Sequence, residues 1–126
     1  MRNFSLHVPS TPSDPAWVMV RARGELDRSS ELEFRQALEE AVAAEATVLL
    51  VDLGEVSFLD SAGLSVLVGV KRRLELDRDL RLCQVPRRVM RSLELSGITK
   101  LLPVQAVGDP WPWSDVADPG EHLEAI

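Results

Sequence analysis

The 126-residue sequence predicts a single α/β domain with a mixed, mostly parallel sheet of four to five strands packed with helices. Apolar strand-like runs alternate with segments of helical periodicity, and this order requires crossover connections between parallel strands. The run over residues 48–53 is almost entirely apolar, which is typical of a strand covered on both faces. The length fits one core, and we expect the domain to occupy residues 1–107.

The first third of the chain predicts a hairpin followed by a helix. Alternation over residues 4–8 indicates a first strand, and a PSTPSDP turn leads to a second strand over residues 17–23, so the two strands should pair antiparallel. Ser30 and Glu33 have the spacing of a capping box. The helix that follows carries one apolar stripe, formed by Phe34, Ala37, Leu38, Ala41 and Val42.

The last third predicts a strand, a helix and a final strand. Leu80, Leu82 and Val85 mark the strand, Pro86 lies near the start of the helix, and Gly97 is placed to cap its end. Residues 101–107 form the expected last strand. Residues 108–126 combine prolines, two tryptophans and several acids without a helical or strand period, and we expect this tail to be loosely ordered.

The composition of the chain indicates which kinds of partner it binds and in which cellular compartment it works. The net charge of −6 argues against nucleic acid, because phosphate binding requires clustered cations, and the one basic run, residues 71–73, suits the end of a helix. The single Cys83 cannot form an internal disulfide and is expected in the core. No run approaches the ~18 apolar residues of a membrane helix. These features predict a cytoplasmic protein with no membrane partner.

Catalysis is not expected from the residue pattern. A serine nucleophile needs a base within hydrogen-bond reach, and the only histidines, His7 and His122, lie near the two ends of the chain. No His or Cys pair has metal-ligand spacing, and the glycines form no phosphate-binding loop. We therefore predict no catalytic residue, no metal and no cofactor.

The most informative segment is residues 51–67, because it places a serine at the start of a helix. Asp60 and Ser61 are both good N-caps, and Leu64, Leu67 and Val68 follow at helical spacing. A phosphate on Ser61 would meet the positive end of the helix and its unpaired N–H groups. From the residues alone, ordinary capping and a phosphorylation switch both remain open for Ser61.

Three short motifs resemble the STAS domain family of bacterial anti-anti-sigma factors. FLDSAGL at residues 58–64 resembles the family's phosphorylation signature, GELDR at residues 24–28 its first strand-to-helix turn, and LELSGITKLL at residues 93–102 its last helix exit. The resemblance covers roughly residues 4–107 and implies a STAS-like fold. Ala62 departs from it, because many relatives have a second serine or threonine there, and the tail lies outside it.

The resemblance implies an anti-sigma factor antagonist. Such a protein binds an ATP-dependent anti-sigma serine kinase when it is unphosphorylated, and phosphorylation at Ser61 switches this binding off. A serine phosphatase removes the phosphate, and the cycle regulates sigma-factor-dependent transcription. Taken alone, Asp27 is an acidic loop residue that assists the start of the next helix, whereas the resemblance implies that it lies at the partner interface. Gly63 allows close packing or the approach of another backbone, or its presence is incidental. The partner-binding residues expected on this basis are Glu25, Asp27, Asp60, Ser61, Ala62 and Gly63.

A second function stays open at this stage. A STAS-type subunit that docks onto a larger assembly, such as a lipid transporter ATPase complex or a stress-signalling complex, would share the fold and the motifs but need no phosphorylation cycle.

Overall fold

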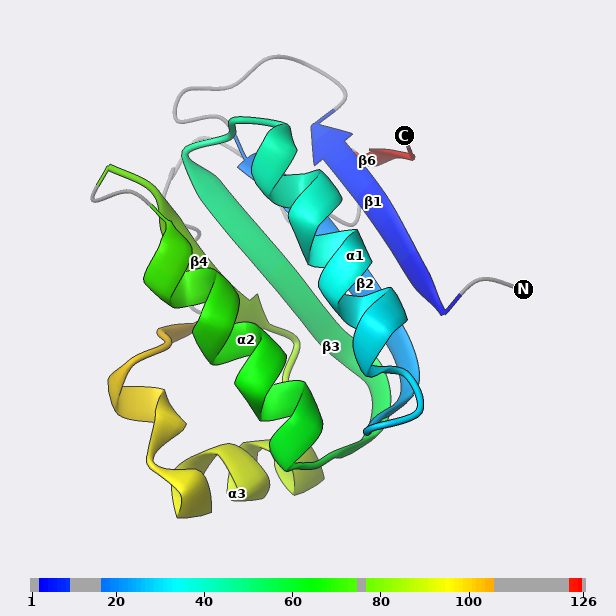
Figure 1. The fold of residues 1–126 in the computed structure, drawn as a ribbon, viewed down its shortest axis with the longest axis vertical. Helices are drawn as coiled ribbons and strands as arrows, with labels where there is room; N and C mark the ends of the chain where they lie inside the picture. Colours follow the sequence, from blue (N-terminus) through cyan, green and yellow to red (C-terminus); the bar gives the residue numbers. More distant parts are fainter. Residues whose placement is uncertain (1–2, 10–16, 75–76, 106–122, 126) are drawn as a thin grey trace.

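A computed structural model describes residues 3–9, 17–74, 77–105 and 123–125 of the chain (Figure 1). Strands and helices alternate through most of this region, as the sequence predicts. The elements in chain order are β1 (Phe4–Pro9), β2 (Trp17–Leu26), α1 (Glu31–Ala43), β3 (Val48–Leu59), α2 (Ser61–Arg73), β4 (Asp79–Cys83), α3 (Arg87–Ser96), the 3-10 helix η1 (Ile98–Lys100), β5 (Val104–Gln105) and β6 (Leu123–Ala125).

The strands form one mixed sheet in the order β5-β4-β3-β2-β1-β6. β2, β3, β4 and β5 pair in parallel, whereas β1 is antiparallel to β2 and to β6. The predicted α/β class, the mostly parallel sheet and the opening hairpin are therefore confirmed. In the described residues the sheet has six strands and not four to five, because β6 pairs with the outer edge of β1.

β6 belongs to the segment that the sequence assigned to the tail. It pairs Leu123–Ala125 with His7, Val8 and Pro9. Residues 108–122 and 126, including Trp111 and Trp113, lie outside the described residues. The expected loose order of the tail and the domain boundary at residue 107 therefore stay predictions.

β2 and β3 run further than the sequence predicts, to Leu26 and Leu59. Their parallel register shifts twice, between Arg21 and Arg23 and again after Gly24, whose φ of +79° suits glycine. These irregularities let both strands continue past the apolar run, so β3 does not end with residues 48–53 but extends to Leu59. The extension brings the end of β2 beside the start of α2, where the Asp60 N–H donates to the Leu26 carbonyl at 3.2 Å.

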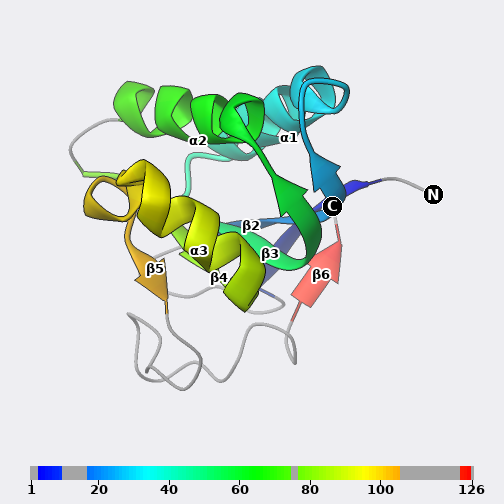
Figure 2. The same cartoon turned by 90° about the horizontal axis from the view of Figure 1, so that it is seen from below.

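α1 and α2 cover one face of the sheet, and α3 lies across the end of the strands (Figure 1, Figure 2). α1 and α2 lie side by side across β2 and β3 (Figure 1), and α3 packs beyond α2 against the end of β3 (Figure 2). Their apolar stripes meet the inward side chains of the strands in the main core, which includes Phe34, Leu38, Leu67, Val70, Val89 and Leu93. Gly97 ends α3 in the left-handed conformation with φ +77°, as predicted.

A smaller apolar cluster lies on the other side of the sheet. It contains Trp17, Met19, Val48, Leu50 and Cys83, and all five are buried. The expected core position of Cys83 is confirmed. No helix in the described part of the chain is long and apolar enough to span a membrane.

Candidate functional site

The start of α2 is fixed by Asp60, not by Ser61. The Asp60 carboxylate accepts hydrogen bonds from the N–H groups of Ala62 at 2.9 Å and Gly63 at 3.4 Å, and Asp60 has the extended backbone of an N-cap. Ser61 is the first helical residue and is exposed. Because the neighbouring aspartate caps the helix, the Ser61 hydroxyl does not have to serve as the cap acceptor.

This geometry corrects one expectation about a phosphate on Ser61. The sequence suggested that unpaired first-turn N–H groups would receive the phosphate, but the Asp60 carboxylate already accepts from two of them. A phosphate would also lie beside that carboxylate, and like charges repel. Asp60 therefore already occupies two of the N–H groups at the start of α2 that the sequence left open for a phosphate.

Gly63 allows the close approach of α2 to the end of β2. A Cβ at this position would lie 2.5 Å from Leu59 Cδ1 and 2.8 Å from the Leu26 carbonyl oxygen, both too short for unbonded atoms. Gly63 is buried, whereas Ala62 is half-buried. The structure thus gives Gly63 a packing role beneath the surface.

The loop between β2 and α1 is held by Asp27. Its Oδ1 accepts from the Ser29 hydroxyl at 2.6 Å and from the N–H groups of Ser29 at 2.9 Å and Ser30 at 3.3 Å. The Ser29 hydroxyl, together with these N–H groups, lowers the pKa of Asp27 below its ordinary value. Asp27 therefore stays charged at the surface and orders the loop as well.

The predicted capping box at Ser30 and Glu33 does not form. The Ser30 hydroxyl donates to the Glu25 carbonyl at 2.7 Å and accepts from the Asp27 N–H at 3.1 Å, so it points back into the loop. Ser30 makes no side-chain cap to α1. The loop competes successfully for the hydroxyl because Asp27 draws residues 27–30 into a tight turn.

Five of the six predicted partner-binding residues share one surface. The hydrogen bond from Asp60 to Leu26 places the β2–α1 loop next to the start of α2. Exposed Glu25 and Ser61 and half-buried Asp27, Asp60 and Ala62 lie on the two segments that this hydrogen bond joins, and we refer to these five residues as the Ser61 surface. Three of the five are carboxylates, and exposed Arg28 lies in the same loop.

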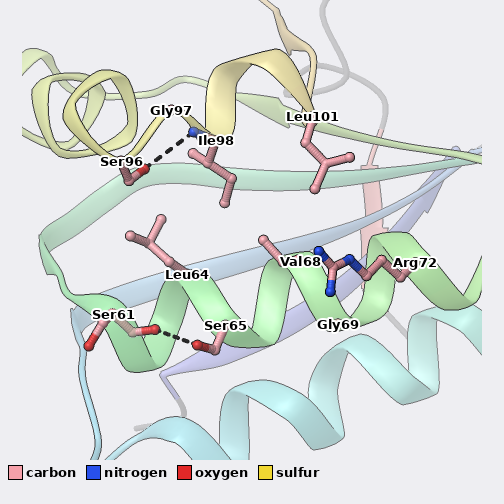
Figure 3. Close-up of a pocket in the computed structure, with 10 residues that line it drawn as sticks. All are labelled: Ser61, Leu64, Ser65, Val68, Gly69, Arg72, Ser96, Gly97, Ile98 and Leu101. Carbon is pink, nitrogen blue, oxygen red and sulfur yellow. Dashed lines mark hydrogen bonds between the residues drawn. The ribbon is translucent and has the colours of Figure 1, made fainter.

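A groove that no sequence pattern indicates adjoins this surface. It lies between α2 and η1 and has a volume of about 580 Å³. Leu64 and Val68 point into it from α2, and Ile98 and Leu101 face them (Figure 3). Leu64 and Val68 follow at helical spacing, and both are only half-buried. The other lining residues are Ser61, Ser65, Gly69, Arg72, Ser96 and Gly97.

A buried ion pair on the far face of the sheet also escaped prediction. Asp52, which is 6% exposed, accepts from Arg21 Nε at 3.0 Å and from the Gly54 N–H at 2.8 Å. Burial, reinforced by the Arg21 charge, lowers the pKa of nearby His7. No group of three or more His, Cys, Asp or Glu in the described ranges has the geometry to hold a metal ion.

Known proteins share this fold, in which helices pack on a mixed sheet. The sequence model of the STAS domain matches residues 8–109. The chain belongs to the STAS domain family. It is 31% identical over 106 residues to the anti-sigma-B factor antagonist of Listeria monocytogenes, covering 83% of this chain and 91% of that relative.

Solved structures agree with this family. An anti-sigma factor antagonist from Mycobacterium paratuberculosis superposes with a TM-score of 0.67 at 26% identity, over 79% of this chain and 85% of that one. The anti-sigma factor antagonist SpoIIAA in its unphosphorylated form gives 0.63 at 23% identity, over 82% and 88%. SpoIIAA in its phosphorylated form gives 0.56 at 23%, over 82% and 91%. The SpoIIAA matches establish the shared fold.

Proposed function

We propose that this STAS domain is an anti-sigma factor antagonist that binds an anti-sigma serine kinase while Ser61 is unmodified and loses that partner once Ser61 is phosphorylated. The observation that carries the proposal is the exposed Ser61 hydroxyl on the first turn of α2, with the capping role taken by Asp60. The names of the relatives support the general role, and the phosphorylated form of SpoIIAA supports the modification.

Local charge supplies the switch. A phosphate adds about −1.5 to −2 charges beside Asp60, on a surface that already carries Glu25 and Asp27. A charge left unpaired at an interface costs about 2–5 kcal/mol, which corresponds to a roughly 30-fold to several-thousand-fold loss of affinity. The kinase uses ATP, a serine phosphatase removes the phosphate, and we place this cycle in the cytoplasm.

Neighbouring hydroxyls make poorer acceptors than Ser61. Ala62 offers none, and the Ser65 hydroxyl, one turn along α2, donates to the Ser61 carbonyl at 2.8 Å. Ser65 is also exposed, which makes it a matched control in the same helix.

Phosphopeptide mapping tests the assignment. The anti-sigma factor is recovered with the chain from source cells, identified by mass spectrometry, purified and incubated with ATP and each variant. We expect label on the native chain and on Ser65→Ala, and none on Ser61→Ala. Full labelling of Ser61→Ala would contradict the proposal. Recovery of a transporter ATPase in place of an anti-sigma factor would favour a docking subunit without a phosphorylation cycle.

A further inference from the structure

We infer that the groove between α2 and η1 is a second contact for the anti-sigma factor and receives an amphipathic helix of about three turns with an acidic residue at one end. The inference rests on the proposed function and names a feature of the partner. It starts from the position of the groove, because Ser61 lines one end of it and Arg72 the other (Figure 3). A kinase domain that reaches Ser61 is therefore already beside the groove.

The floor of the groove is apolar and open. Leu64 and Val68 extend from α2 toward Ile98 and Leu101, and Leu101 remains 40% exposed. Leu64 and Val68 are four residues apart on one helix face, so they present two successive ridges to an incoming segment. Aliphatic side chains of a partner would bury this surface, and burial of apolar area is the main favourable term in association.

Arg72 gives the groove a charge preference. Its two neighbours in the last turn of α2 are engaged, because Lys71 pairs with Asp79 at 2.7 Å and Arg73 pairs with Glu39. Arg72 is exposed and has no ion-pair partner among the residues that the structure describes. A carboxylate on the occupant would complement this cation, whereas a lysine or arginine would be repelled. The occupant is therefore acidic at the end that meets Arg72.

The surroundings favour a helical occupant over an extended one. The groove is lined by α2, the end of α3, and the η1 segment, and none of its described lining residues belongs to a strand. An extended segment would find no strand to pair with, whereas a helix satisfies its own backbone groups. The distance along α2 from Ser61 to Arg72 is about 16 Å at 1.5 Å per residue, which matches a helix of about eleven residues.

Two groove variants, each with a matched control, test this inference. Leu101→Asp places a charge on the apolar floor, and Leu95→Asp makes the same change at a residue that is 83% exposed and does not line the groove. Arg72→Glu reverses the charge at the end of the groove, and Arg88→Glu makes the same substitution at an exposed position on α3. All four sites are exposed, so we expect melting temperatures close to that of the native chain.

Affinity for the purified anti-sigma factor, measured by calorimetric titration, is the primary readout. We expect Leu101→Asp to bind roughly tenfold more weakly or worse, and Arg72→Glu several-fold more weakly, with a deficit that shrinks at high salt. Both controls should bind like the native chain. An acidic-to-lysine change in the partner helix should restore binding to Arg72→Glu.

Other outcomes overturn the inference without touching the proposed function. If both groove variants bind like their controls while Ser61→Asp still binds weakly, the groove is not a contact and the switch stands. If sedimentation shows self-association of the native chain that Leu101→Asp abolishes, the occupant is a second copy. In contrast, if the native chain does not bind the anti-sigma factor, the proposed function itself fails.

Discussion

Replacement of Gly63 by alanine is expected to destabilise the domain, although alanine is the better helix former. The new Cβ would lie 2.5 Å from Leu59 Cδ1 and 2.8 Å from the Leu26 carbonyl oxygen. The leucine side chain has some freedom to rotate, but the carbonyl accepts the Asp60 N–H and belongs to β2, so relief requires α2 to move. Overpacking of this kind costs about 1–3 kcal/mol.

Gly69 provides the matched control in the same helix. It is exposed, and an added Cβ would meet no atom within 4 Å. Gly69→Ala should stabilise the domain by about 0.5–1 kcal/mol, because alanine loses less backbone entropy in a helix interior. The two alanine variants should therefore differ in free energy of unfolding by roughly 2–3 kcal/mol, with opposite signs relative to the native chain.

Urea denaturation measures this difference directly. With a slope of about 2 kcal/mol per M, the transition midpoints of the two variants should lie about 1–1.5 M apart. The slope itself should not change, because both substitutions leave the folded state compact. A Gly63→Ala protein as stable as Gly69→Ala would refute the close approach of α2 to β2 and the packing role of Gly63.

Three carboxylates give further predictions. Asp60→Ala should lower the free energy of unfolding by about 1 kcal/mol, as loss of an N-cap does, and an unchanged urea midpoint would mean that another group caps α2. Asp27→Asn keeps an oxygen that accepts the loop N–H groups, so it should melt normally but bind the anti-sigma factor more weakly; equal affinity would exclude a role for the charge. Burial raises the pKa of Asp79, but Lys71 and Arg81 lower it more, to a net value below 3.8. A carboxylate whose pKa is lowered by folding stabilises the folded state at pH values above its unfolded-state pKa. The native chain should therefore have a higher melting temperature than Asp79→Asn at pH 7 and lose this advantage below about pH 3.8. A melting-temperature advantage that grows on acidification would contradict the ion pairs.

The fold was predictable where local signals agree with tertiary packing. The apolar run beginning at Val48 and the helical stripe beginning at Phe34 each fix an element and its buried face. The lengths of β2 and β3 were not predictable, because the register shifts around Gly24 depend on pairing between residues about thirty positions apart. β6 was missed for a related reason: it exists through pairing with β1 and has no periodicity of its own.

The site was predictable in composition but less so in geometry. The motif identified Asp60 and Ser61 as the start of a helix, but only the hydrogen bonds show which of them is the cap. Ser30 fits a capping-box spacing, yet the loop around Asp27 takes its hydroxyl. The groove could not be predicted, because Leu64 and Val68 have the spacing of core residues and their partial exposure depends on where η1 lies.

The affinity of the phosphorylated chain for the anti-sigma factor tests the central claim most directly. The chain would be phosphorylated to completion at Ser61, verified by intact mass, and titrated calorimetrically against the partner beside the unmodified chain and Ser61→Ala. We predict tight binding for the unmodified chain and for Ser61→Ala, and a loss of roughly 30-fold or more on phosphorylation. Equal affinities for the phosphorylated and unmodified chains would contradict a switch based on charge at Ser61.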